Sequence, residues 1–426
     1  MDAISQEHAP GRTSRSAPGP VPAGSGPYAA RLEARIFVVV LLAGALLMLG
    51  GAWAAAYMHA HGHAVTGMTN QVVWGMPHVF AIFMIVAASG VLNVASVGSV
   101  FGKPVYKVRA KLSGLLSLAL LAGGLAVLML DLGRPDRVVI AATHYNARSV
   151  FAWNVLLYSG LFAIVAVYLW MMMERRMNRY AKLAGIAALS WRIVLTTGTG
   201  VIFAFLVARQ AYHSAVLPPM FIAMSLAWGT AIFLLAQSGI HAWQGRPVDV
   251  AVERRIARLL ALFVIAACYF VLVYHLTNLY FAHQSAFVRF ILVDGGVFPV
   301  LFWGGYVLAG TVAPLLLIFH PALASRRTLL AACALIVLGA FAQLYVFIVG
   351  GQAWPLELFP GHVATSTFFD GAIEHYRPSL PEWLLGLGGV GLALAATVIG
   401  LRVLPFLRAD EVAAVDEAAA RSNREV

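Results

Sequence analysis

Uncharged apolar stretches of about twenty residues recur along most of this sequence. A helix of about 20 apolar residues crosses the hydrocarbon core of a bilayer, which is roughly 30 Å thick. Lipid offers no hydrogen-bond partners, so each crossing segment must satisfy its own peptide groups, as an α-helix does. Only 11% of the residues are charged, which leaves long stretches free of charge. The sequence therefore predicts an all-α integral membrane protein with many spans.

We count ten membrane spans. They cover residues 36–58, 72–98, 112–131, 149–172, 185–207, 217–238, 257–281, 298–319, 328–350 and 383–407. The first thirty residues are rich in Pro, Gly, Ser and Ala and show no cleavable signal, which predicts a disordered tail. The expected organisation is a cytoplasmic tail over 1–30, a ten-helix membrane domain over 31–408 and a second cytoplasmic tail over 409–426.

The basic residues are distributed unequally between the two sides that this topology defines. Of the 29 Lys and Arg residues, 22 fall on one side, within 12–35, 103–111, 175–182, 246–258, 326–327 and 402–424. The other side holds Arg134, Arg137, Arg148, Arg209, Arg289 and Arg377. Cytoplasmic loops carry the excess of Lys and Arg, so both termini are expected in the cytoplasm. In a bacterial inner membrane the other, outer side faces the periplasm. The net charge of +11 thus reflects topology and does not indicate nucleic-acid binding.

Polar residues that could take part in binding or catalysis gather near the outer ends of the predicted spans. The stretch "LMLDLGRPDRVVI" ends an uncharged span with Asp131 and places Arg134 in the following Gly-Arg-Pro turn. In "NQVVWGMPHVF", Trp74 precedes His78, which lies just inside the outer boundary. Ionisable residues within a span are costly and mark functional sites. Asp131 also fits a plainer role, in which it caps its helix or pairs with Arg134.

Other polar positions within the spans have both structural and functional interpretations. Asn154 and Tyr158 in "SVFAWNVLLYSG" lie one turn apart on one helix face, where they could bind a ligand or join helices. His275 and Asn278 in "VYHLTNLYF" form a second outer group. Arg192 lies well inside a span, so its charge must face the bundle interior and pair with a polar residue of a neighbouring helix. It fits either a structural or a proton-path role.

The sequence predicts no resident redox metal. Its two cysteines, Cys268 and Cys333, are too few for an iron–sulfur cluster, which usually takes four. A di-haem subunit needs four axial ligands, whereas His78 and His275 are the only histidines expected inside the membrane. The histidines at 59, 61 and 63 lie in a Gly-containing loop and are not expected to hold a metal. Nucleotide-binding and metalloprotease motifs are also lacking.

Several longer motifs accompany these residues. "DLGRPDR" closes one span, "SVFAWNVLLYSG" opens the next, and "TGTGVIFAFLVARQAYHSAVLPPMFIAMSLAWGTA", "FWGGYVLAGTVAPLLL" and "YVFIVGGQAWPLELFPG" follow. Together they resemble the NrfD/PsrC family of membrane quinone-interacting subunits, from about residue 68 to 400. The ten-span length and the late motifs are most similar to the branch that contains DsrP and HybB, with DsrP the first choice.

The sequence departs from the family pattern in two places. Gly198 stands where an aromatic residue often precedes the Thr-Gly of the fifth span, and Gln210, Ala211 and Tyr212 replace the usual Pro-Leu-Trp. A quinone-contacting tyrosine of the polysulfide reductase membrane protein lies near the first of these positions, so that contact is not carried over. A histidine in the first helix of the family core, by contrast, matches His78.

The resemblance implies two four-helix bundles, formed by the second to fifth and the sixth to ninth spans and flanked by the first and tenth. It also implies menaquinone or ubiquinone bound near the periplasmic face of the first bundle. The electron partner would be a periplasmic ferredoxin-like iron–sulfur subunit docked on the outer loops, with further members of the complex beyond it. The chain itself would carry neither haem nor an iron–sulfur cluster.

We interpret the outer residues within this frame. His78 and Asp131 are the expected catalytic pair: His78 hydrogen-bonds a quinone oxygen, and Asp131 holds the proton or sets the local electrostatics. Arg134 would stabilise the charged form of Asp131 and orient the turn. The expected quinone-binding residues are Trp74, His78, Asp131, Arg134, Asn154 and Tyr158.

The long outer loop over 351–382 is the expected docking surface, with Glu357 and Arg377 as docking residues. Two other functions remain open. A secondary transporter would also have many helices, but its polar sites typically lie at the midplane in broken helices. A passive anchor for the iron–sulfur subunit would tolerate replacement of every outer polar residue.

Overall fold

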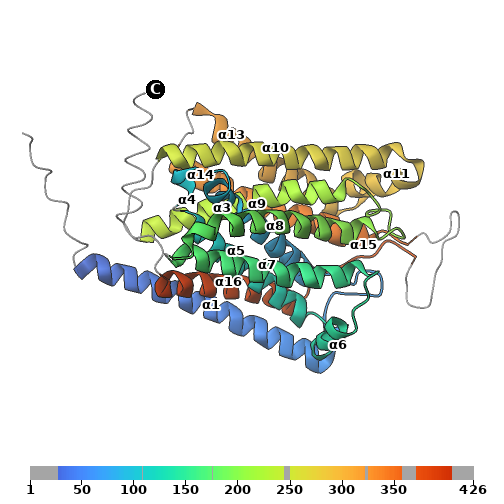
Figure 1. The fold of residues 1–426 in the computed structure, drawn as a ribbon. Coiled ribbons are helices and arrows are strands. Elements are labelled where there is room, and N and C mark those ends of the chain that lie inside the picture. Colours follow the sequence, from blue (N-terminus) through green and yellow to red (C-terminus); the bar gives the residue numbers. More distant parts are fainter. Residues whose placement is uncertain are drawn as a thin grey trace, which may run out of the picture.

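The computed structural model describes residues 27–107, 109–174, 176–243, 250–321, 325–356 and 371–404. Within these ranges every regular element is a helix (Figure 1). Ten of the described segments are long and apolar enough to cross a membrane. They are Arg35–His61, Met76–Ser99, Ala110–Leu130, Val150–Met173, Asn178–Ala204, Leu217–Ala242, Val250–Tyr280, Val297–Phe319, Arg326–Ala353 and Leu380–Val403. The predicted all-α class and the ten predicted spans are confirmed.

Seven spans are built on one long helix each. These are α1 (Pro27–His61), α5 (Ala110–Leu130), α7 (Val150–Met173), α8 (Ala181–Ala204), α9 (Leu217–Trp243), α10 (Val250–Tyr280) and α16 (Leu380–Val403). Before α8 runs the short η3 (Asn178–Tyr180). The remaining three spans are composite. They comprise α2 (Met76–Val91) with α3 (Asn93–Ser99); α12 (Val297–Val300) with the π-helix η5 (Leu301–Val312) and α13 (Ala313–Phe319); and α14 (Arg326–Tyr345) with the π-helix η7 (Val346–Gly350) and α15 (Gly351–Ala353).

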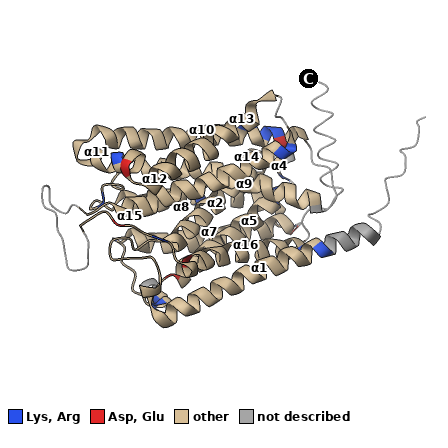
Figure 2. Ribbon diagram, turned by 180° about the vertical axis from the view of Figure 1, so that it is seen from behind, with Lys and Arg blue, Asp and Glu red and all other residues tan. Residues whose placement is uncertain are grey.

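Short helices lie between the spans. They are η1 (His63–Val65), α4 (Pro104–Lys107), η2 (Pro135–Arg137), α6 (Val138–Thr143), α11 (Ala282–Arg289) and the π-helix η4 (Phe290–Asp294). The charged residues gather mainly towards the two ends of the long helices, and most of the middle is uncharged (Figure 2). This distribution is what a bilayer around the middle of the molecule requires.

Helix α2 forms the centre of the molecule. The most apolar part of its span is entirely buried, whereas only 11% of the corresponding part of α1 is. Helix α2 packs on α5, α9, α14 and α16, and α1 lies along α16 at the periphery (Figure 1). Because α2 contacts helices of both halves of the chain, the division into two four-helix bundles stays a prediction.

Glycines let α2 approach α9 closely. A Cβ atom at Gly90 would lie 1.6 Å from the carbonyl oxygen of Ser225, and one at Gly229 would lie 2.1 Å from the carbonyl carbon of Gly90. Neither position can carry a side chain unless the backbones separate. Small residues at such contacts are how membrane helices gain packing energy without a hydrophobic driving force. This contact fixes α2, and with it His78, relative to the second half of the chain.

The start of α2 differs from the prediction. The helix begins at Met76 rather than at 72, and Gly75 is its extended N-cap residue. Pro77 therefore occupies the first turn, where a missing backbone N–H costs no hydrogen bond. Residues 72–75 leave the helix and become available to cross the outer face, and His78 lies in the first turn instead of deeper in the span.

Candidate functional site

His78 and Asp131 meet at the outer ends of two helices. Asp131 is the C-cap residue of α5, and the first turn of α2 carries His78. The Nδ1 atom of His78 lies 2.8 Å from Oδ2 of Asp131. The carboxylate is almost sealed, with 2% of its side chain exposed, whereas His78 is 17% exposed. A ligand from outside can therefore reach the imidazole but not the acid behind it.

This geometry sets the roles of the two imidazole nitrogens. Because Nδ1 faces the carboxylate, it carries the hydrogen of the neutral ring, and Nε2 is left as the acceptor. Nδ1 of His78 and both carboxylate oxygens of Asp131 are buried; Nδ1 and Oδ2 lie at ion-pair distance, and none of the three atoms has a hydrogen bond of good geometry among the described residues. A carboxylate at this distance stabilises an imidazolium once the ring has taken a proton. The pair is therefore suited to accept a proton from a ligand at Nε2.

An aromatic wall stands beside His78. The indole of Trp74 stacks on the imidazole, with ring centroids 5.9 Å apart and an angle of 27° between the rings. Phe203 from α8 meets Trp74 edge-on at 5.5 Å, and Phe151 from α7 does so at 6.4 Å. Such arrangements are favourable aromatic geometries. The wall is thus assembled from three separate parts of the chain.

The expected pairing of Arg134 with Asp131 is wrong. Arg134 is exposed and binds Asp136 through Nη2 and Nε, at 2.9 and 3.1 Å. The hydrogen bond from Arg134 holds the pKa of Asp136 below its ordinary value and, in return, raises the pKa of the guanidinium. The turn directs Arg134 to water, while Asp131 at the helix end faces inward to His78. His78, not Arg134, is the partner of Asp131.

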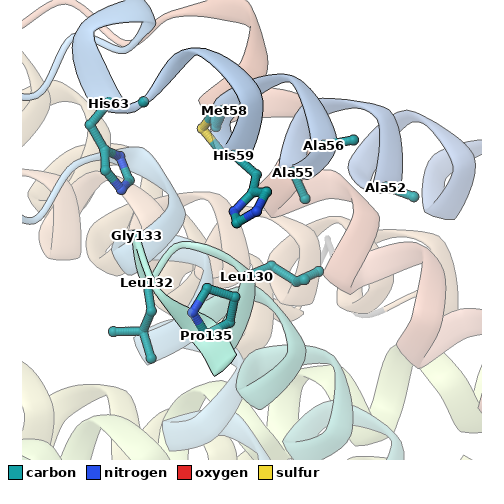
Figure 3. Close-up of a pocket in the computed structure, with 11 residues that line it drawn as sticks. Ala52, Ala55, Ala56, Met58, His59, His63, Leu130, Leu132, Gly133 and Pro135 are labelled. Carbon is teal, nitrogen blue, oxygen red and sulfur yellow. The ribbon is translucent and has the colours of Figure 1, made fainter. Parts of the chain in front are cut away.

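A cavity lies on the α1 side of the same turn (Figure 3). It measures about 400 Å³ and runs between the outer end of α1 and the segment that flanks Asp131. Its lining is formed by Ala52, Ala55, Ala56, Met58, His59, Gly62, His63, Leu130, Leu132, Gly133 and Pro135. The cavity exists because several of the α1 residues that line it are small, and His59 and His63 border an otherwise apolar hollow. No group of three His, Cys, Asp or Glu within the described ranges is arranged to hold a metal ion.

Asn154 and Tyr158 are both buried on α7. The side-chain amide of Asn154 donates to the carbonyl of Val150 at 2.9 Å and to that of Gly198 on α8 at 3.4 Å, and its Oδ1 has no partner within the described chain. Asn154 therefore joins α7 to α8, which is the structural role that its position also allowed. Phe151, one turn away, is the residue of α7 whose ring contact with Trp74 is established.

Arg192 lies in a different polar cluster. Its Nη1 donates to Oδ1 of Asn93 at 2.7 Å and to the carbonyl of Ser89 at 3.0 Å. The hydroxyls of Ser89 and Thr196 lie 2.7 Å apart beside it. The prediction that this charge faces the interior and pairs with a polar residue of a neighbouring helix is confirmed.

His275 and Asn278 form a separate buried group on α10. The ring of His275 contacts Phe302 edge-on at 4.8 Å, and its Nδ1 has no hydrogen-bond partner among the described residues. No acidic side chain in the described ranges forms an ion pair with it. The structure thus gives a histidine–carboxylate pair to His78 but not to His275.

The expected docking residues lie in or beside the last outer loop. Glu357 falls outside the described residues. Arg377 is exposed and borders a second hollow of about 830 Å³, between the outer end of the eighth span and residues 373–378. Arg289 and Asp294, which pair at 2.8 Å, and Glu374 line the same hollow. Charged groups of both signs thus surround an outer recess with aromatic walls.

Sequence reasoning missed the residues that hold the outer segment over 64–76 in place. Tyr376 donates to Glu382 at 2.6 Å and accepts from the N–H of Met76 at 2.6 Å, while Glu382 also accepts from the N–H of Gly67 at 2.8 Å. Burial and, after it, the charge of Glu382 raise the pKa of Tyr376, so its hydroxyl keeps the proton that it donates. Two further hydrogen bonds join the same segments: Gln71 donates to the carbonyl of Ala353, and Gln352 accepts from the N–H of Val73. Tyr376 and Glu382 are six residues apart, but the other bonds join residues about 300 positions apart in the sequence, and no local pattern pairs them.

Fold and site together define a class: a membrane protein with ten candidate spans among its described residues and a histidine–carboxylate pair at one end of its central helix. The family model described as "Polysulphide reductase, NrfD" matches residues 64–355. This chain belongs to the NrfD polysulphide reductase family.

Three relatives resemble the chain over most of their length. The Hdr-like menaquinol oxidoreductase integral membrane subunit of Archaeoglobus fulgidus is 28% identical over 377 residues, which cover 87% of this chain and 93% of the relative. A putative dimethyl sulfoxide reductase membrane subunit of Halobacterium salinarum is 28% identical, covering 85% and 90%. A selenate reductase subunit of Mesobacillus selenatarsenatis is 20% identical, covering 81% and 89%.

Proposed function

We propose that this chain is the quinone-interacting membrane subunit of a multi-subunit oxidoreductase. It exchanges electrons between the membrane quinone pool and an iron–sulfur subunit docked on its outer face. The observation that carries the proposal is the 2.8 Å pair of His78 and Asp131, reached from outside through the imidazole. Membership of the NrfD family and the likeness to an archaeal menaquinol oxidoreductase agree with it.

The pair supplies the proton chemistry of quinol oxidation. A quinol gives up two electrons and two protons, and the electrons would pass one at a time to the iron–sulfur partner subunit. Nε2 of His78 accepts a hydroxyl proton, and Asp131 stabilises the resulting imidazolium at 2.8 Å. Because His78 is partly exposed, it can release that proton to the outer side and then accept the second. Quinone reduction follows the same path in reverse.

The surroundings fit a flat, apolar substrate. Trp74 offers a ring face beside His78, and Tyr158 and Asn154 lie in the adjoining part of α7. The cavity next to the turn, lined by Leu130 and Leu132 on either side of Asp131, has room for part of an isoprenoid tail (Figure 3). At the entrance to the proposed quinone site, Arg134 would stabilise the turn by pairing with Asp136. It would not act on Asp131.

We place the protein in the bacterial inner membrane, multi-pass, with both termini in the cytoplasm, because its basic residues crowd one side. The substrate is menaquinone or ubiquinone. The iron–sulfur partner is periplasmic and ferredoxin-like, and it docks near Glu357 and Arg377. Among the branches of the family, the DsrP-like one fits the ten-span length best, which suggests sulfur-compound electron transfer.

Quinone binding by the isolated protein tests the proposal. A short-chain naphthoquinone is titrated into purified protein in detergent, and quenching of tryptophan fluorescence is followed. The wild type is expected to show saturable quenching. His78→Leu is expected to bind about 10-fold or more weakly, because the quinone carbonyl loses the charge-assisted hydrogen bond that Nε2–H of the imidazolium donates. A passive anchor, or a transporter of another solute, predicts no saturable quenching in either protein.

A further inference from the structure

We infer that Gln352 is a positioning residue of the quinone site: it holds Trp74 against His78 from the opposite half of the chain. The inference rests on the proposed function, since it concerns the wall of that same site. Gln352 lies in α15, at the end of the ninth span, and is 278 positions from Trp74. It makes no contact with His78, so its effect on a substrate must pass through Trp74.

The side-chain amide of Gln352 grips the backbone on both sides of the Trp74 peptide unit. Its Oε1 accepts from the N–H groups of Val73 and Trp74, both at 3.0 Å. Its Nε2 donates to the carbonyl of Trp74 at 3.0 Å and to that of Ile348, one turn back in its own helix, at 2.9 Å. Both amide hydrogens and both oxygen lone pairs are thus used. Gln352 is 1% exposed, so its amide is shielded from water although Val73 beside it is exposed.

The backbone groups of Trp74 need hydrogen-bond partners from another segment because Trp74 lies outside any helix. Helix α2 begins only at Met76, and the carbonyl of its N-cap residue Gly75 already accepts from the first turn, so the peptide groups of residues 72–74 lie outside the helical hydrogen-bond pattern. Backbone groups shielded from water are costly to leave without partners, and Gln352 bonds three partly buried ones at once, the N–H groups of Val73 and Trp74 and the carbonyl of Trp74. A side chain that fixes both the N–H and the carbonyl of one residue also fixes the direction in which its Cβ points. The orientation of the Trp74 indole therefore depends on Gln352.

A second set of bonds keeps Gln352 itself in place. Arg209, between α8 and α9, donates to the carbonyl of Gln352 at 3.1 Å and to the carbonyl of Gln71 at 2.7 Å. Gln71 returns a bond to the carbonyl of Ala353 at 2.9 Å. Three segments distant in sequence are thus tied together around the Trp74 peptide. The ring wall of the site is anchored on the second half of the molecule.

The chain offers a matched control for testing this role. Gln343 lies in the same span as Gln352, is 3% exposed, and its Oε1 has no hydrogen-bond partner among the described residues. Gln352→Leu and Gln343→Leu remove the same group from the same helical span, but only the first releases Trp74. Gln352→Glu keeps the size of the side chain and the two acceptor bonds, but it replaces the two donor bonds with a buried carboxylate oxygen that faces the carbonyls of Trp74 and Ile348.

The first measurement needs no quinone. Protein carrying 5-fluorotryptophan is purified in detergent, and the Trp74 signal is assigned in the ¹⁹F NMR spectrum by its loss in Trp74→Phe. Gln352→Leu and Gln352→Glu are expected to shift or broaden this signal, whereas Gln343→Leu leaves it unchanged. An unmoved Trp74 signal in folded Gln352→Glu protein would overturn the inference.

The second measurement is a double-mutant cycle on quinol oxidation by the assembled complex. We expect Gln352→Leu and Trp74→Phe each to raise KM about 10-fold, as the loss of one well-formed hydrogen-bond or stacking contact does, with a smaller change in kcat. The double variant should be no worse than either single one, because both act through the same ring. Fully additive effects on KM, or an unchanged KM in Gln352→Leu, would contradict the inference. A failure of the proposed function appears separately, as wild-type affinity in His78→Leu.

Discussion

His78 gains its chemistry from a partner that the chain places behind it, out of reach of solvent. Asp131 approaches Nδ1 at 2.8 Å, and its side chain is 2% exposed, so the acid can act on a substrate only through the imidazole. Arg134 lies three residues further along but belongs to a solvent-exposed pair with Asp136. The carboxylates of Asp131 and Asp136, five residues apart, thus have different surroundings, and we propose that they have different functions.

Asp131→Asn and Arg134→Gln separate these two functions. Asparagine keeps the size of the side chain and a polar group beside Nδ1 of His78 but loses the charge that stabilises the imidazolium. We expect quinol turnover to fall about 10- to 150-fold, as for the loss of a charged hydrogen bond, with a smaller effect on quinone affinity. Arg134→Gln should change turnover less than about fivefold, because exposed ion pairs contribute little. Both rates are measured in reconstituted complex. Equal losses in the two variants would contradict the assignment of Asp131 to His78.

At the scale of helices, α2 is held by contacts that only small residues allow. Gly90 and Gly229 bring α2 and α9 together so closely that a Cβ at either position would overlap the neighbouring backbone. Gly239, on the same α9, faces open space. The two environments predict opposite responses to the same substitution.

Gly90→Ala should destabilise the protein, and Gly239→Ala should not. The added Cβ at Gly90 would lie 1.6 Å from the Ser225 carbonyl oxygen, so the helices must separate. Overpacking of this kind costs about 1–3 kcal/mol or more, whereas alanine at an open helical position is tolerated or slightly stabilising. Thermal unfolding in detergent measures both. A melting temperature unchanged in Gly90→Ala would show that α2 and α9 do not pack as described.

The helices were predictable from sequence because the length of each uncharged apolar stretch gives the approximate length of a membrane-spanning helix. The His78 site was predictable in part, since an ionisable residue near the end of a span has few roles and the motifs resemble those of a known family. The bonds of Gln352, Tyr376 and Glu382 were not predictable, because they join segments about 300 positions apart or depend on a loop path that no periodicity encodes. The Arg134 pairing was wrong because proximity in sequence does not show that the chain turns Asp131 inward.

For the whole molecule, the account requires that the His78 end face the outside. The topology predicted from the sequence assigns most of the basic residues to the opposite side, which is the expected cytoplasmic one. The recess that contains Arg289, Glu374 and Arg377 is lined by Trp354 and residues 373–378, the described parts of the last predicted outer loop. An external partner would then meet the quinone site and the recess on one face.

Topology is tested by reporter fusions. Fusions within 103–111, 176–182 and 246–258 should report the cytoplasm, and those within 134–148 and 351–382 should report the outside, because the positive-inside bias sets the orientation. Enzymatic activity of periplasm-specific and cytoplasm-specific reporters provides the readout. A cytoplasmic signal from 351–382 would put the proposed partner on the wrong side of the membrane.

Docking is tested at Arg377, which is exposed and borders the outer recess. Arg377→Glu should weaken co-purification of the iron–sulfur subunit, because charge reversal at an interface repels a matching acidic group. Arg148, also exposed and basic but on another outer segment, offers the control Arg148→Glu. Quantitative co-purification at two salt concentrations is the measurement. Retention of the partner at wild-type levels in Arg377→Glu would exclude this residue from the interface.

The central claim is that His78 is the proton acceptor for quinol, and His78→Leu tests it most directly. Leucine has similar bulk but can neither accept a proton nor bond a quinone oxygen. Quinol oxidation is measured in reconstituted complex, with assembly verified, beside the control His275→Leu. We predict that His78→Leu abolishes quinol-linked electron transfer and that His275→Leu retains it. Normal turnover in well-assembled His78→Leu, or its loss only in His275→Leu, would place the quinone site elsewhere and contradict the account.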